Sequence, residues 1–156
     1  EGLFTFDKDM NPVPLLAEGY ERSADGLTYT VRLKKGVQFH DGTEFDAEAV
    51  KLNFDRVLRP NSGLTRRAIY TFIDTVKVVD KYTVQFTLKY PHGGFIRRLA
   101  MNNTMMVCPS LIKAAGGNKA GLALKSCGTG PYIQEEFNPS EKFVVKEPQL
   151  PHQRSA

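Results

Sequence analysis

Two pairs of adjacent polar residues have side chains suited to holding a small solute. Arg66 and Arg67 follow a predicted helix, and neighbouring guanidinium groups can grip one carboxylate through paired hydrogen bonds. Asn102 and Asn103 follow a predicted short helix, where their amides can bind a peptide backbone or a chelating ligand. Each pair also has an ordinary explanation, because exposed arginines are common in loops and asparagine readily ends a helix.

The chain contains two cysteines, Cys108 and Cys127. Their spacing fits no CxxC metal or redox motif. A disulfide between them would close a loop and stabilise the fold by about 3 kcal/mol in the loop-entropy account. Free thiols would instead pack as small apolar groups. The residues alone leave both possibilities open.

The sequence lacks the common patterns of catalytic and cofactor-binding sites. His40, His92 and His152 are isolated from one another, whereas a transition-metal site needs several convergent ligands. The turn Gly128–Gly130 lacks the phosphate-loop pattern and precedes a predicted strand. Ser110 has no G-x-S-x-G context. We therefore predict no catalytic residue, no cofactor and no bound metal.

Composition and charge predict an ordinary globular domain. The 156 residues are 41% hydrophobic and 24% charged, which suits one domain with a single core. The net charge is +4, but 21 basic residues are interspersed with 17 acidic ones. This mixture argues against a nucleic-acid-binding stripe. No apolar run approaches the roughly 18 residues that a membrane span needs.

The strongest local pattern is a strand followed by a capped helix. Leu27, Tyr29, Val31 and Leu33 alternate with polar residues, as in a half-buried strand. After a turn at His40–Thr43, Asp46 is placed to cap a helix, with a hydrophobic staple between Phe45 and Val50. The helix is predicted to end at Arg59-Pro60.

Further elements follow with weaker patterns. The sequence predicts a hairpin from two strands, 76–79 and 82–88, joined at Asp80-Lys81, and a second hairpin from strands 132–137 and 143–146. Short helices are predicted over 95–101 and 109–115, and a loop or short helix over 61–72. The fold class is therefore α/β (α+β), with a mixed, largely antiparallel sheet flanked by short helices.

Several short motifs, taken in order, resemble those of a known family. They are Pro14-x-Leu16-Ala17-Glu18, Asp25-Gly26-Leu27-Thr28-Tyr29-Thr30, Leu33-x-x-Gly36-Val37-x-Phe39-His40-Asp41-Gly42, Asp46-Ala47-x-x-Val50 and Gly128-Thr129-Gly130-Pro131-Tyr132. Each has modest specificity alone, whereas their common order and spacing are specific. From about Glu1 to Glu147 the chain resembles the peptide/nickel/opine solute-binding proteins (solute-binding protein family 5), the extracytoplasmic receptors of ABC importers.

The resemblance implies a subdomain of a type II periplasmic-binding-protein-like fold. It implies recognition of peptides, nickel chelates or similar small solutes in the periplasm or outside the cell, and delivery to an ABC permease in the membrane. In nickel-binding relatives, arginines near the position of Arg66-Arg67 face the anionic ligand, and some relatives place ligand-facing residues near Met101–Thr104. The oxidising compartment favours a disulfide between Cys108 and Cys127.

Relatives in this family are several times longer, so we expect residues 1–147 to form a subdomain inserted into the first lobe of a receptor. Residues 148–156 show no periodicity and are expected to form a disordered tail. An isolated subdomain should bind the ligand weakly or not at all. The alternative is a stand-alone protein-interaction module that docks a permease or self-associates through an exposed sheet edge.

Overall fold

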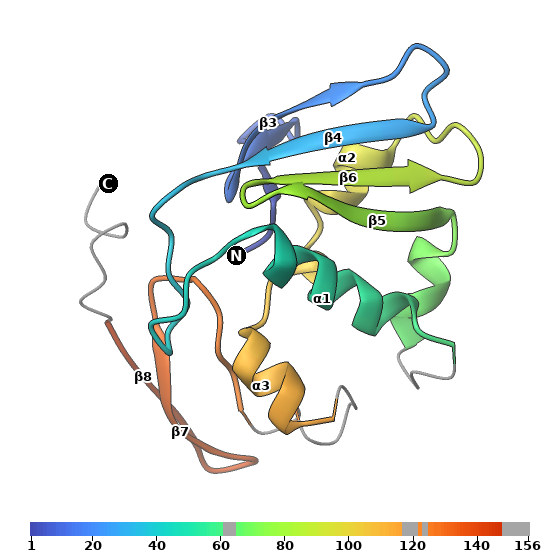
Figure 1. The fold of residues 1–156 in the computed structure, drawn as a ribbon. Helices are drawn as coiled ribbons and strands as arrows, with labels where there is room; N and C mark the ends of the chain where they lie inside the picture. The colour runs from blue at the N-terminus through green and yellow to red at the C-terminus, as the bar shows by residue number, and fades with distance from the viewer. Residues whose placement is uncertain (61–64, 117–121, 123–124, 148–156) are drawn as a thin grey trace.

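The computed structural model describes residues 1–60, 65–116, 122 and 125–147, apart from the side chains of Thr65, Arg66 and Asn103. Its central feature is a four-stranded sheet in the order β3-β4-β6-β5 (Figure 1). The strands are β3 (Ala17–Arg22), β4 (Thr28–Leu33), β5 (Ile73–Asp80) and β6 (Thr83–Leu88).

One face of this sheet is buried. Tyr29 and Val31 of β4 lie opposite Phe86 and Val84 of β6, and all four side chains are buried. Thr30 and Gln85, which lie between them on the two strands, are only half-buried. This alternation is typical of an antiparallel sheet that covers a core on one side and faces water on the other, and it confirms the predicted pattern.

Two helices cover the buried face. The ring of Phe86 lies 5.0 Å from that of Phe54 in α1 (Ala47–Leu58) and 5.4 Å from that of Phe95 in α2 (Phe95–Leu99). Both contacts are edge-to-face, the arrangement that aromatic quadrupoles favour. Helix α1 also packs along β5, so its position is set by the sheet.

Helix α1 begins where the sequence predicts. The Asp46 carboxylate accepts a hydrogen bond from the Ala49 N–H at 2.8 Å, which satisfies one of the free donors of the first turn. Phe45 and Val50 are both fully buried, as expected for a hydrophobic staple. The helix ends at Leu58, and Arg59 is its C-cap.

The N-terminal strands were not predicted. β1 (Phe4–Phe6) pairs with β2 (Pro12–Pro14), and β3 forms the edge of the central sheet. The sequence analysis predicts no strand or helix before Leu27. β3 lacks an apolar alternation because most of its side chains are exposed at the sheet edge, so a pattern search cannot detect it.

The C-terminal strands form a hairpin of their own. β7 (Ile133–Asn138) pairs with β8 (Lys142–Lys146), and Figure 1 shows this hairpin near α3 (Pro109–Ala114), away from the central sheet. Every strand pairing among the described residues is antiparallel. The predicted fold class is therefore confirmed. The predicted tail, residues 148–156, lies outside the described residues.

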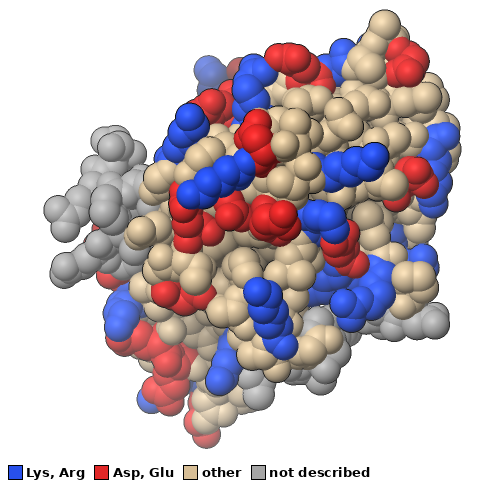
Figure 2. All heavy atoms as spheres, in the orientation of Figure 1, with Lys and Arg blue, Asp and Glu red and all other residues tan. Residues whose placement is uncertain are grey.

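Charges of both signs are distributed over the surface. Figure 2 shows basic and acidic side chains interspersed on the face that it presents. Several of them pair across strands, such as Arg32 with Glu21 at 2.5 Å. No helix in the described part of the chain has the length and apolar character to cross a membrane.

The cap of α1 can be tested by mutation. We expect Asp46→Ala to lower the free energy of unfolding by about 1 kcal/mol, because the substitution leaves the Ala49 N–H without its acceptor. Urea denaturation measures the change. Asp46→Asn should lose only a few tenths of a kcal/mol, since asparagine caps almost as well. Equal losses in both variants would contradict a capping role.

Candidate functional site

A disulfide joins the start of α3 to the segment that leads into the C-terminal hairpin. Cys108 and Cys127 are bonded, with their Cα atoms 5.4 Å apart, a separation within the usual range. The Cys108 N–H also donates to the Cys127 carbonyl at 2.9 Å. The bond closes the segment between them, which includes α3.

His40 holds the same junction from the other side. Its Nδ1 accepts from the Gly128 N–H at 3.3 Å, and its Nε2 lies 2.8 Å from the Gly130 carbonyl, to which it donates. Each ring nitrogen therefore has a partner, which fixes the neutral tautomer with the proton on Nε2. A hydrogen bond from the His40 N–H to the Gly128 carbonyl, 2.8 Å long, completes the contact.

Asp41 is part of this junction and accepts hydrogen bonds from two neighbouring residues. Ser110 donates to one carboxylate oxygen, and the Thr43 N–H and hydroxyl donate to the other. Burial opposes ionisation of Asp41, but these hydrogen bonds outweigh it and hold the pKa of Asp41 below its usual value. Asp41 also lies near both sulfur atoms, which cannot act as thiolate ligands while they are bonded to each other.

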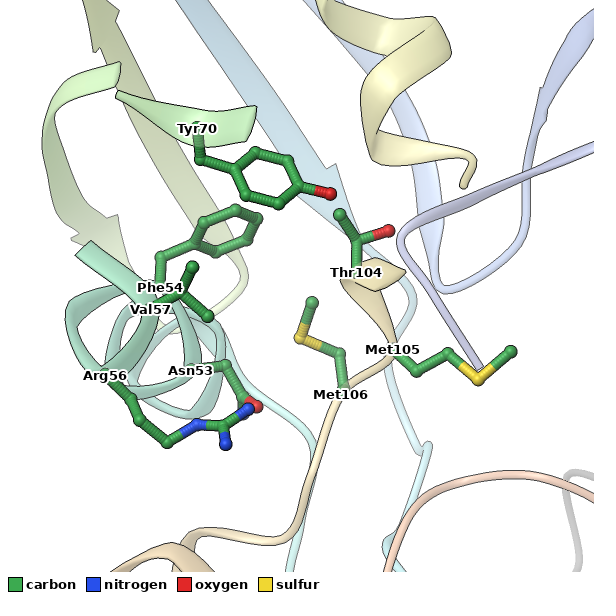
Figure 3. Close-up of a pocket in the computed structure, with 8 residues that line it drawn as sticks. All are labelled: Asn53, Phe54, Arg56, Val57, Tyr70, Thr104, Met105 and Met106. Atoms are coloured by element: carbon green, nitrogen blue, oxygen red, sulfur yellow. The ribbon is translucent and has the colours of Figure 1, made fainter. Parts of the chain in front are cut away.

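A pocket lies at the edge of α1, where two short 3-10 helices end. The first is η1 (Thr65–Tyr70) and the second is η2 (Asn102–Thr104). Figure 3 shows Tyr70 pointing toward Thr104, with the side chains of α1 on the same side as Tyr70 and Met106 opposite them. The lining residues are Asn53, Phe54, Arg56, Val57, Tyr70, Thr104, Met105 and Met106. Its interior of about 20 Å³ holds little more than one water-sized group.

Asn53 fixes the two walls of the pocket together. Its side-chain Nδ2 donates to the Val107 carbonyl at 2.9 Å, and its Oδ1 accepts from the Val107 N–H at 3.0 Å. Nδ2 also donates to the Ala49 carbonyl at 2.9 Å. The amide thus binds the backbone after η2 as another strand would, and it holds this segment against α1.

The segments that carry the predicted ligand residues both end at this pocket. η1 contains Arg66 and Arg67, and η2 contains Asn102 and Asn103. Arg67 is half-buried, and its Nε donates to the Leu58 carbonyl at 3.2 Å, so part of its guanidinium satisfies the end of α1. Asn102 is exposed. The side chains of Arg66 and Asn103 lie outside the described residues, and the roles of all four residues remain predictions.

The sequence analysis did not identify Arg56 or Asn53. They are three positions apart on α1 and therefore share a face. This spacing is the only signal that the sequence offers. The spacing of Asn53 and Arg56 is the same on a pocket wall as on a solvated helix face. The segment that makes this face a pocket wall, residues 104–106, comes about fifty positions later in the sequence.

Comparison with known proteins identifies the class to which this small α+β domain belongs. Residues 11–149 match the family model described as "Bacterial extracellular solute-binding proteins, family 5 Middle". The chain belongs to this family of extracellular solute-binding proteins, as the sequence motifs predicted.

Named relatives agree with this assignment. The chain is 44% identical over 146 residues to the glutathione-binding protein GsiB of Salmonella paratyphi A, which covers 94% of this chain and 28% of GsiB. It is 43% identical over 148 residues to GsiB of Pectobacterium atrosepticum, with 92% and 28% coverage. The chain therefore spans less than a third of the length of these relatives.

Solved structures share the fold. NikZ from Campylobacter jejuni in complex with Ni(L-His) superposes with a TM-score of 0.85 and 28% identity, over 94% of this chain and 29% of NikZ. The binding protein AgaA of Agrobacterium tumefaciens R10 in complex with agropinic acid gives a TM-score of 0.84 at 28% identity, over 94% and 29% of the two chains. The predicted periplasmic-binding-protein architecture is confirmed.

Reduction of the disulfide should weaken the fold. We expect the free energy of unfolding to fall by about 3 kcal/mol when Cys108–Cys127 is reduced, because the unfolded chain regains the freedom of the closed loop. Urea denaturation with and without a phosphine reductant measures this loss. The Cys108→Ala/Cys127→Ala variant should have a lower free energy of unfolding than the oxidised wild type, and the reductant should not change that value. Unchanged wild-type stability, with free thiols verified by alkylation, would rule out a stabilising disulfide.

Replacement of Asn53 should separate the pocket walls. Asn53→Ala removes both hydrogen bonds to Val107 and leaves those backbone groups without partners, which should cost about 2–3 kcal/mol. Denaturation measures the loss, and hydrogen exchange should accelerate at the Val107 amide. Asn102→Ala, at an exposed position, should change stability by less than about 0.5 kcal/mol. Slow exchange at Val107 in the Asn53 variant would refute the clamp.

Proposed function

We propose that this chain is part of a substrate-binding receptor of an ABC importer and takes part in recognising a small solute. The family match over residues 11–149 carries this proposal. Because the chain spans 28% of the relatives named above, we propose that residues 1–147 are the subdomain inserted into the first lobe of a longer receptor. Most of the solute's contacts then come from elsewhere in that receptor.

The proposed receptor works outside the cytoplasmic membrane and performs no reaction. Its partner is an ABC permease in the membrane, and transport energy comes from the permease's ATPase. The observations that support a binding role are the family description, which specifies extracellular solute-binding proteins, and the hydrogen bonds that occupy His40, Asp41 and Ser110 at the disulfide junction. His40 bonds the backbone of Gly128 and Gly130, and Ser110 and Asp41 bond each other beside the disulfide.

The proposed ligands are peptides, nickel chelates or similar small solutes that carry a carboxylate. Glutathione, the ligand in the name of the GsiB relatives, has two carboxylates, and the histidine bound with nickel in NikZ has one. Arg66, Arg67, Asn102 and Asn103 are the proposed contacts. They belong to η1 and η2, whose last residues line the pocket beside α1.

The second candidate is an interaction module that self-associates or docks a permease. The C-terminal hairpin favours it, because β7 and β8 pair only with each other among the described residues and expose aromatic side chains. Tyr132 and Phe143 are 62% and 61% exposed. A concentration-dependent oligomer without solute binding would support this alternative, and sedimentation velocity over a hundredfold range of concentration would detect it.

A binding screen tests the receptor proposal. Titration calorimetry of reduced glutathione, a tripeptide and Ni(L-His) should give saturable binding to a receptor-length protein that contains this chain. The isolated 156-residue chain should bind the same ligand weakly or not at all, because most of the site is absent. Equal affinity in the two proteins would contradict the subdomain assignment, and no binding to either would contradict the receptor proposal for these ligands.

Charge-removing variants test the proposed contacts. Arg66→Ala should weaken binding about 10- to 100-fold in the receptor-length protein, the effect of losing a charged hydrogen bond worth about 1.5–3 kcal/mol. Arg67→Ala should also lower stability, because Arg67 donates to the Leu58 carbonyl. The pair Lys34-Lys35 is exposed and provides a matched control when both lysines are changed to alanine. Wild-type affinity in the Arg66 and Arg67 variants would exclude these residues from the site.

A further inference from the structure

Arg56 is a half-buried cation without a visible counter-charge. Its Nε is inaccessible to solvent and has no hydrogen-bond partner among the described residues. Other arginines of the chain do have partners: Arg32 pairs with Glu21, Arg67 donates to the Leu58 carbonyl, and Arg97 lies over the ring of Phe6. Arg56 therefore differs from these arginines in its surroundings.

This arrangement is energetically costly. An unsatisfied buried donor costs about 1–3 kcal/mol, and more when it belongs to a charged group. Burial lowers the pKa of Arg56, and no opposing interaction offsets that effect. Buried charges in proteins are normally paired, so the surroundings of Arg56 are suited to an anion.

The cavity beside Arg56 has room for such a group. Arg56 lines the pocket with the apolar side chains of Phe54, Val57 and Met106 (Figure 3). The pocket's interior of about 20 Å³ matches a single oxygen-sized group. Met105, which also lines the pocket, is 52% exposed, so the pocket lies close to the surface.

Two other polar side chains on the wall, Asn53 and Thr104, are already engaged. Asn53 binds Val107 and the Ala49 carbonyl. The Thr104 hydroxyl is within 2.8 Å of the Leu99 and Met101 carbonyls, which compete for its single proton. A buried water needs two to four polar partners, and a water here would leave the charge of Arg56 uncompensated. A carboxylate oxygen both accepts from Nε and neutralises the guanidinium.

We propose that the pocket formed by α1 and residues 104–106 admits one oxygen of a carboxylate group, with Arg56 as the cationic partner of that group. The carboxylate comes either from a solute, in which case the inference rests on the receptor function proposed above, or from an Asp or Glu of a receptor polypeptide outside the 156 residues. The chemistry at Arg56 is the same for both sources, and experiment separates them.

Nitrogen-15 NMR of the 156-residue chain tests the site directly. Titration with sodium acetate should shift the Arg56 Nε–Hε resonance along a saturable curve, while sodium chloride at equal ionic strength should not. The Arg32 resonance serves as an internal control, because its guanidinium already pairs with Glu21. No saturable shift at Arg56 would overturn the proposal.

Matched variants link the NMR signal to stability. Arg56→Gln should abolish the increase in thermal stability that acetate produces over chloride, whereas Arg59→Gln, at the exposed C-cap of the same helix, should retain it. Arg56→Lys should retain part of it, because lysine keeps the charge but lacks the planar fork. Equal responses to acetate in the Arg56→Gln and Arg59→Gln variants would overturn the site.

The receptor-length protein identifies the source of the carboxylate. If a solute supplies it, acetate competes with reduced glutathione, and Arg56→Gln weakens glutathione binding more than Arg59→Gln does. If the polypeptide supplies it, acetate no longer shifts the Arg56 resonance, and Arg56→Gln lowers stability more than in the 156-residue chain. If Arg56→Gln changes neither glutathione binding nor the stability of the receptor-length protein, the carboxylate site is overturned while the receptor proposal stands. Acetate binding at Arg56 without any solute binding would instead count against the receptor function alone.

Discussion

The contact between Asn53 and Val107 determines where the pocket forms. α1 and residues 104–107 are far apart in the sequence and share no backbone ladder, so a side-chain amide supplies the pairing that a sheet would otherwise provide. With the backbone after η2 held in place, Thr104 and Met106 face α1 across a narrow gap. An apolar side chain at position 53 could fill the space but could not satisfy the Val107 N–H and carbonyl.

The sheet gives this contact a rigid base. Phe86 at the centre of the buried face touches Phe54 of α1 and Phe95 of α2, so one strand position fixes both helices. The disulfide and His40 perform the corresponding task at the start of α3, where they hold the segment that leads into the hairpin. The pocket and the hairpin thus lie at places held by side-chain bonds, while the sheet and its helices hold the core.

The sequence predicted the helix and strands in which buried apolar residues recur at a regular spacing. β4, β6 and α1 bury every second or every third to fourth residue, and their patterns were sufficient to place them. β3 was missed because it is an exposed edge strand. The cysteine pairing was left open by the residues alone, since the Cα separation depends on how α3 meets the hairpin. The sequence could not identify Arg56 as a pocket residue, because most polar residues on a helix face solvent and only the folded structure shows that a distant segment covers this one.

An unpaired, partly buried cation in a marginally stable domain calls for a physical explanation. Native domains have only about 5–15 kcal/mol of stability, so the cost of desolvating Arg56 is a measurable fraction of the total. Leucine or methionine at this position would bury the same helix face without that cost, and buried charges are often replaceable by apolar residues at no loss of stability. Conflicts between a local residue and the stability of the fold concentrate at functional sites. The position of Arg56, between two segments with predicted ligand contacts, therefore fits recognition of an anion better than it fits packing.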